Sequence, residues 1–78
     1  MQEINFDVSL DVRGLSLPRP LVSTKKAVDS LKSGGILKIV TSDQENANNF
    51  QTFARHASLT MLASNERNGQ FQFFIRKP

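Results

Sequence analysis

Two prolines bracket one arginine at positions 18–20, and this arrangement fixes where a helix can begin. Proline holds φ near the helical value and lacks an amide hydrogen that the first turn would leave unpaired. Apolar and polar residues alternate before this point, so residues 10–20 mark the end of a strand and the start of a helix. The unpaired amides and the helix dipole make the position just before Pro18 electropositive. That position holds Leu17.

The first half of the chain predicts a strand, a helix and a second strand. Alternation over residues 4–11 predicts a strand whose buried face consists of Ile4, Phe6, Val8 and Leu10. Apolar spacing predicts a helix from Pro18 or Arg19 to Ser33, ended by Gly34-Gly35, because glycine accepts the left-handed cap conformation. The β-branched run over residues 36–41 predicts a more central strand, parallel to the first.

The second half predicts a helix and a hairpin. Ser42-x-x-Glu45 has the form of a capping box and predicts a helix that continues to about Ala57. Two alternating segments follow, separated by residues 65–69, and Asn68-Gly69 supplies the positive φ of a tight turn. We expect an antiparallel hairpin whose last strand buries Phe71, Phe73 and Ile75.

The element order β-α-β-α-β-β predicts an α+β two-layer sandwich. The simplest packing is a four-stranded mixed sheet with both helices on one face, and the whole chain, residues 1–78, as a single domain. The open face of the sheet would be mainly polar, with Leu62 and Phe74 as its apolar exceptions.

Composition narrows the classes of function. The chain has no cysteine, which excludes disulfides, thiol redox chemistry and thiolate metal sites. We expect no metal site and no cofactor. The N-terminus is too polar for a signal peptide and no apolar run approaches a membrane span, so we expect a cytoplasmic protein without membrane contact. A formal net charge of +3 is compatible with an acidic partner or nucleic acid.

Residues 10–20 resemble the signature of the small sulfur-carrier proteins of the TusA/SirA-like family. The family pattern is Leu-Asp-x-x-Gly-Leu-x-Cys-Pro-x-Pro, and this chain has Leu10-Asp11-x-x-Gly14-Leu15-x-Leu17-Pro18-x-Pro20. The match continues in Lys25-Lys26-Ala27, in Gly34-Gly35 and in Phe74-Ile75-Arg76-Lys77. The resemblance implies the same β-α-β-α-β-β sandwich. It also implies a sulfurtransferase-like role, in which the cysteine accepts a persulfide sulfur from a cysteine desulfurase and passes it on, typically toward tRNA thiolation.

The active position of this family is the one at which the chain departs from it. Leu17 has no nucleophile, and the neighbouring Ser16 would be a poor persulfide carrier. We therefore expect a non-catalytic binding or regulatory homologue, whose partner by resemblance is a cysteine desulfurase or another sulfur-relay protein. The scaffold residues carried over from the motif are Asp11, Gly14, Pro18 and Pro20. The candidate partner-binding residues are Arg13, Arg19, Lys25 and Lys26.

The sequence leaves other functions open. The chain would also suit a small basic RNA-binding module on the same scaffold, which uses helix N-termini and lysines against phosphate. On the open sheet face, Phe74 is the aromatic expected to be exposed for base stacking, or to form a small dimer patch with Leu62. A further hypothesis is that the chain only positions the thiol of a partner.

Overall fold

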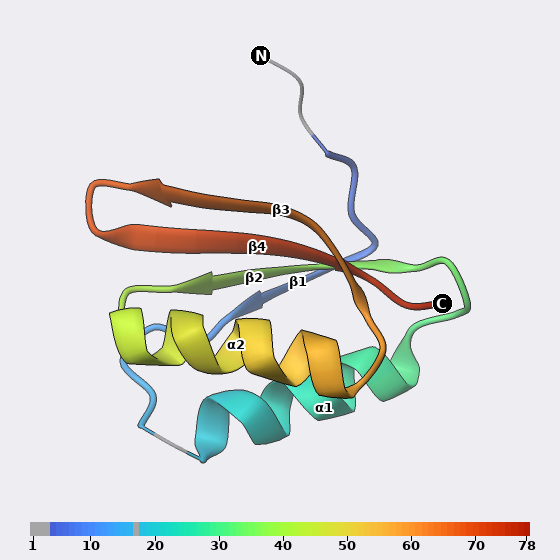
Figure 1. Cartoon of the computed structure of the whole chain (residues 1–78), viewed down its shortest axis with the longest axis horizontal. Helices are drawn as coiled ribbons and strands as arrows, with labels where there is room; N and C mark the ends of the chain where they lie inside the picture. The colour runs from blue at the N-terminus through green and yellow to red at the C-terminus, as the bar shows by residue number, and fades with distance from the viewer. Residues whose placement is uncertain (1–3, 17) are drawn as a thin grey trace.

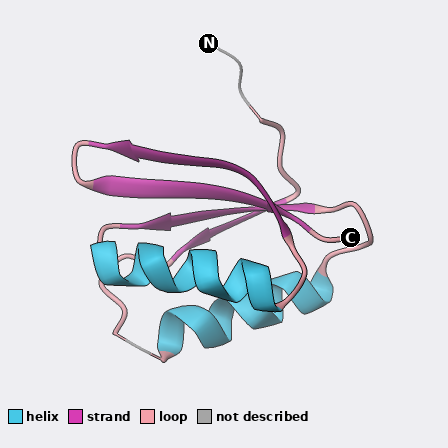
Figure 2. Ribbon diagram, viewed as in Figure 1, coloured by secondary structure: helices cyan, strands magenta, loops and turns pink. Residues whose placement is uncertain are grey.

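The computed structural model describes residues 4–16 and 18–78 and confirms the predicted sandwich. Its elements are, in order, β1 (Val8–Asp11), α1 (Arg19–Ser30), β2 (Ile36–Thr41), α2 (Gln44–His56), β3 (Thr60–Arg67) and β4 (Gln70–Arg76). The four strands lie in the order β1-β2-β4-β3, with β1 parallel to β2 and the other pairs antiparallel. Both helices cover the same face of the sheet (Figures 1 and 2). Within the described residues, neither helix is long and apolar enough to cross a bilayer.

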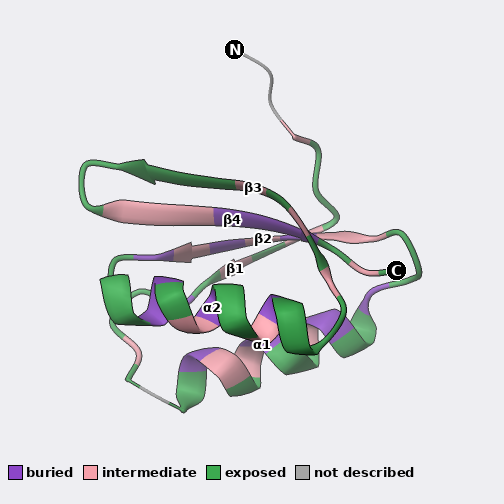
Figure 3. Cartoon of the chain, in the orientation of Figure 1, coloured by how far each residue is buried: buried purple, intermediate pink, exposed green. Residues whose placement is uncertain are grey.

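The core lies between this face and the two helices (Figure 3). Leu37 and Ile39 of β2 and Phe73 and Ile75 of β4 point into it, and for β4 this is the face that the alternation predicts. Phe50 of α2 packs on Phe73 with ring centroids 5.8 Å apart in a tilted arrangement, which aromatic pairs favour. The two middle strands therefore supply most of the buried sheet surface.

The first strand begins at Val8 and not at Ile4, and Phe6 does not face the core. The chain bends at Asp7, where its amide donates to the carbonyl of Ile36 at 2.9 Å and its carboxylate accepts from the Ile36 amide at 2.8 Å. These two hydrogen bonds between Asp7 and Ile36 end the regular pairing of β1 with β2. The alternation of buried and exposed side chains therefore does not extend to Phe6. The Phe6 ring instead lies against Phe74, which belongs to the open face.

Helix α1 ends at Ser30, three residues before the predicted end. Leu31 is extended, and the ammonium of Lys77 donates to the carbonyls of Val28 and Leu31 at 3.0 and 2.9 Å. A basic side chain from beyond β4 thus satisfies helix-end carbonyls and complements the negative end of the dipole. Glycine is not needed as the cap, and Gly34 lies in the following turn, where its amide donates to the Lys77 carbonyl.

The cap of α2 is Asp43 and not Ser42. The Asp43 side chain accepts from the Glu45 amide at 2.8 Å, so the N-cap lies one residue later than predicted and the predicted Ser42–Glu45 capping box is not formed. Aspartate and serine are about equally good N-caps, and the first intrahelical bond, from Ala47 to the Asp43 carbonyl, selects between them. The helix ends at His56, next to the predicted end.

The hairpin loop consists of two residues only, Asn68 and Gly69, both with positive φ as a type I′ turn requires. The strands therefore extend into the segment predicted as loop. A bulge in β3 between Met61 and Ala63 leaves Leu62 out of register and partly exposed. Phe74 is on the open face as predicted, but it is only 8% exposed, so its predicted exposure is wrong.

Replacing Lys77 with methionine should lower the free energy of unfolding by about 1–2 kcal/mol, because two helix-end carbonyls lose a charged donor. Chemical denaturation would measure this loss. Lys32→Met is the matched control, because Lys32 is exposed and makes no side-chain hydrogen bond within the described residues. Equal stability of Lys77→Met and the control would contradict a capping role.

Candidate functional site

The motif residues form a loop between the end of β1 and the start of α1 (Figure 1). Val12 is fully buried, and its amide donates to the Val40 carbonyl at 2.9 Å, which continues the parallel pairing for one residue beyond β1. A tight turn follows, closed by a bond of 3.2 Å from the Leu15 amide to the Val12 carbonyl. Gly14 occupies its third position with φ of +79°, a conformation that glycine adopts without a Cβ penalty.

Asp11 and Arg13 form an ion pair inside this loop. The Arg13 Nε and Nη2 atoms donate to the carboxylate at 2.9 and 2.7 Å, and the Arg13 backbone amide donates to it at 3.0 Å. The side-chain bond to Arg13, followed by the backbone bond, lowers the pKa of Asp11 below its ordinary value. Both side chains are about half exposed, so the pair shapes the loop more than it stabilises the fold.

The start of α1 follows from its two prolines. Pro18 is the exposed N-cap residue, and Pro20, in the first turn, is buried. The Arg19 amide donates to the Ser16 carbonyl at 3.0 Å, and the buried Thr24 hydroxyl donates to the Pro20 carbonyl at 2.8 Å. The cap has no side-chain hydrogen bond and the first turn has no acidic residue. The positive end of the dipole is therefore not offset by a carboxylate of that turn.

Asn46 belongs to the site although the sequence analysis did not single it out. It lies in the first turn of α2, is only 3% exposed, and its side-chain amide donates to the Leu15 carbonyl at 3.3 Å. This bond ties the motif loop to the second helix. An asparagine beside Ala47 and ahead of Phe50, on the apolar face of a predicted helix, is the sequence signal that points to such a buried polar contact.

The four predicted partner-binding cations divide into two groups. Arg13 is held by Asp11, whereas Arg19, Lys25 and Lys26 are exposed on α1 and form no ion pair within the described residues. Val22 is 49% exposed and lies three residues after Arg19 and four before Lys26, so these three residues share one face of the helix. The exposed cations Arg19, Lys25 and Lys26 thus surround the apolar Val22 on α1, and the exposed Asp29 lies one turn further along the helix.

Leu17, the position of the family cysteine, lies outside the described residues. Its neighbours Ser16 and Pro18 are both exposed, and the complete sequence has no cysteine. Within residues 4–16 and 18–78, no cluster of His, Asp or Glu side chains is arranged to hold a metal ion. The described part of the loop is therefore a shaped surface next to the cations of α1, and the chain has no cysteine to carry sulfur.

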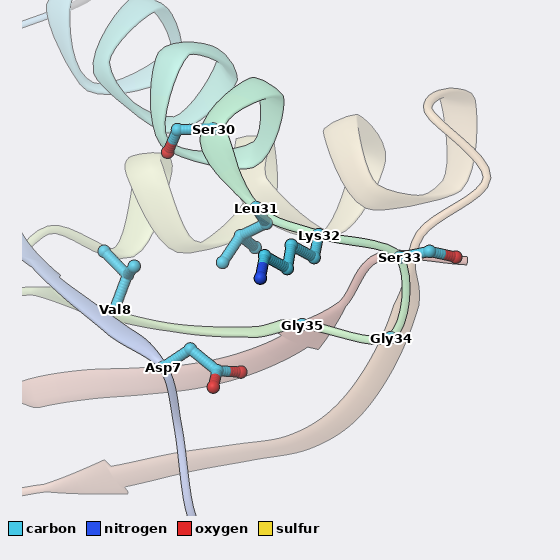
Figure 4. A pocket seen from close by; sticks show the side chains of 8 residues that line it. All are labelled: Asp7, Val8, Ser30, Leu31, Lys32, Ser33, Gly34 and Gly35. Atoms are coloured by element: carbon cyan, nitrogen blue, oxygen red, sulfur yellow. The ribbon is translucent and has the colours of Figure 1, made fainter.

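An open cleft of about 490 Å³ lies at the other end of α1, between Asp7 and the turn that carries Lys32 and Gly34 (Figure 4). Two of its polar groups have partners in the fold: the Asp7 carboxylate accepts from Ile36, and the Gly34 amide donates to Lys77. The Lys32 ammonium, which also lines the cleft, has no hydrogen-bond partner within the described residues. Since β1 separates this cleft from the motif loop, the cleft is not part of the candidate site.

The Asp11–Arg13 pair predicts a pH dependence. A depressed carboxyl pKa stabilises the folded state above the unfolded value of about 3.9, and this contribution is lost as the pH falls through the folded pKa. NMR titration should therefore give a pKa for Asp11 below the ordinary value, and Arg13→Gln should raise it toward that value. Arg19→Gln is the control and should leave it unchanged. An ordinary pKa in the unmodified protein would contradict the ion pair.

Comparison with known proteins agrees with this geometry. Residues 8–77 match the family model described as Sulfurtransferase TusA. The sulfur carrier protein TusA of Allochromatium vinosum is 33% identical over 73 residues, which cover 94% of this chain and 96% of that protein. The putative sulfur carrier protein YrkI of Bacillus subtilis is 32% identical over 71 residues, which cover 91% and 95%.

A solved structure shows the same fold. The crystal structure of a SirA-like protein from Desulfitobacterium hafniense superposes with a TM-score of 0.81 at 24% identity, over 90% of this chain and 96% of that one. The resemblance seen in residues 10–20 therefore extends over almost the whole chain. By sequence, this chain belongs to the TusA family of sulfur-carrier proteins.

Proposed function

We propose that this chain is a non-catalytic member of the TusA family that binds a protein of a sulfur relay. The proposal rests on one observation: the described residues of the motif loop have the expected motif geometry, but the chain has no thiol at position 17. The Asp11–Arg13 pair, the Gly14 turn and the buried Pro20 are all in place, whereas residue 17 is leucine. The described loop residues therefore form a shaped surface without a nucleophile, which suits binding and not catalysis.

The chemistry of persulfide transfer supports the first half of this proposal. In that step a cysteine thiolate attacks the terminal sulfur of the donor persulfide, forms a new S–S bond and releases the donor thiolate. A leucine side chain has no lone pair with which to form this bond. The hydroxyl of Ser16 is not a thiolate and is not paired with a base in the described residues. The chain itself therefore cannot carry sulfur in this way.

The charge of α1 supports the second half. Arg19, Lys25 and Lys26 are exposed, and Val22 lies on the same surface. Cations around an apolar centre suit an acidic partner surface that carries an apolar side chain, since opposite charges steer the encounter and apolar contact holds the complex. By family membership, the partner proposed is a cysteine desulfurase or another protein of a sulfur relay.

A sulfur-transfer assay tests the loss of the nucleophile. With a cysteine desulfurase and radiolabelled cysteine, the natural chain should stay unlabelled, and Leu17→Cys should acquire label that a reducing agent removes. A cysteine placed elsewhere, Ser64→Cys on exposed β3, is the matched control and should acquire far less label.

The outcomes of this assay separate the two halves of the proposal. Label on the natural chain would overturn the argument from residue chemistry. A folded Leu17→Cys variant that is labelled no more than Ser64→Cys would show that this surface does not present position 17 to a desulfurase. Selective labelling of Leu17→Cys would support a binding surface that has lost only its thiol.

Charge reversal tests the docking surface. Changing Arg19, Lys25 and Lys26 together to glutamate should reduce desulfurase binding at least ten-fold, because three attractive contacts become repulsive. Isothermal titration or surface plasmon resonance would measure the loss. The control reverses three cations on other elements, Lys32, Arg55 and Arg67, and changes the net charge equally. Equal loss in both variants would contradict a specific role for α1.

The sequence also suggested an RNA-binding module that uses helix N-termini and lysines, and separately an exposed Phe74 for base stacking. Phe74 is only 8% exposed, so that particular residue does not offer a free ring face. The cations of α1 alone do not distinguish an acidic protein from a phosphate backbone. The exposed Val22 among these cations favours a protein surface, so we propose protein binding for the α1 surface.

A further inference from the structure

The open face of the sheet, which no helix covers, has an exposed aromatic ring in an unexpected place. Because the chain bends at Asp7, Phe6 lies over Phe74 with ring centroids 6.3 Å apart and an angle of 48° between the planes. Phe6 is 45% exposed and Phe74 only 8%. Phe6 is thus the aromatic residue that the open face offers to a ligand, and Phe74 supports it from below.

Cations of this face lie close to the Phe6 ring, and the Lys38 ammonium lies over one face of it. The Lys38 ammonium is 5.2 Å from the Phe6 centroid and 6.0 Å from that of Phe74. Lys38 is opposite Phe74 in the pairing of β2 with β4, and Arg76, two residues after Phe74, projects from the same face. Arg67 projects from this face too, near the hairpin turn. An aromatic ring and several cations therefore share one side of the sheet.

Among the described residues, two acidic side chains lie near this face, and both accept hydrogen bonds. The Asp11 carboxylate is held by Arg13, and the Asp7 carboxylate accepts from the Ile36 amide. The remaining polar side chains include Gln72 and Asn65, which are opposite each other on β4 and β3 and carry both donors and acceptors. The three cations Lys38, Arg67 and Arg76 outnumber Asp7, the carboxylate that no described cation pairs, so the described part of this face has a net positive charge and also carries amide side chains.

We propose that this open face binds single-stranded nucleic acid, with a base stacked on Phe6 and phosphates near Lys38 and Arg76. Sequence-tolerant single-strand binding combines an aromatic platform with a positively charged surface, and both are present here. A second copy of the chain suits the face less well, because two such faces would bring like charges together. The face lies on the opposite side of the sheet from the helices (Figure 1), so this inference does not depend on the proposed function.

Fluorescence anisotropy with a labelled oligouridine tests the inference. The natural chain should bind at low salt and lose affinity as salt rises. Phe6→Leu keeps an apolar cover over Phe74 but removes the stacking ring, and should weaken binding about ten-fold. Arg76→Gln, at an exposed position, should weaken binding and reduce the slope of log affinity against log salt by about 0.7.

Two substitutions on the helix side are the matched controls. Lys26→Gln and Val22→Ala change an exposed cation and an exposed apolar residue of α1 and should leave oligouridine binding unchanged. No binding at low salt would overturn the inference. Equal binding by Phe6→Leu, Arg76→Gln and the natural chain, with loss in Lys26→Gln, would also overturn it and would assign the phosphate contacts to α1. Self-association that Phe6→Leu abolishes, without oligouridine binding, would replace it with a dimer contact.

Discussion

The parallel pairing of β1 with β2 is the constraint on which the rest of the structure depends. Two parallel neighbours cannot be joined by a tight turn, so the chain must cross the sheet between them, and α1 makes this crossing. The crossing begins at the carboxyl end of β1, next to the carboxyl end of β2. That geometry places the Asp11–Pro20 loop at an exposed edge of the sheet, with the N-terminus of α1 directly after it.

The two ends of α1 differ in whether the fold itself complements the charge of the helix dipole. At the C-terminal end, Lys77 donates to two carbonyls and the negative end of the dipole is complemented from within the fold. At the N-terminal end, Pro18 provides no side-chain cap and the first turn has no carboxylate. A fold that satisfies one end internally leaves the other available for an electrostatic contact. In a sulfur carrier this is the end that would favour a thiolate, and here it adjoins a leucine.

The sequence was sufficient for the elements whose signal is local, and insufficient where one residue depends on a distant one. The β-branched run of β2, the alternation of β4, the proline entry of α1 and the Asn68-Gly69 turn involve neighbours along the chain, and all were predicted. Lys77 ends α1 from 46 residues away, and Asn46 holds Leu15 from 31 residues away. Phe6 follows the apolar alternation, yet the Asp7–Ile36 exchange turns it to the opposite face. The contacts of Lys77 and Phe6 leave no periodic signal, and the place of Asn46 on the apolar face of α2 indicates a buried contact but not its partner.

Phe6 lies on the open face of the sheet and not in the core, and this changes the composition of that face. From alternation alone, Phe74 appeared as an isolated aromatic on a polar surface, and such a residue would be costly to leave exposed to water. The N-terminal segment covers it and in doing so puts its own ring at the surface, beside Lys38. Cationic and apolar groups therefore meet on both sides of the sandwich, at Val22 on α1 and at Phe6 on the sheet. Because the sheet lies between them, a protein on one side and a single strand on the other would not compete for the same residues.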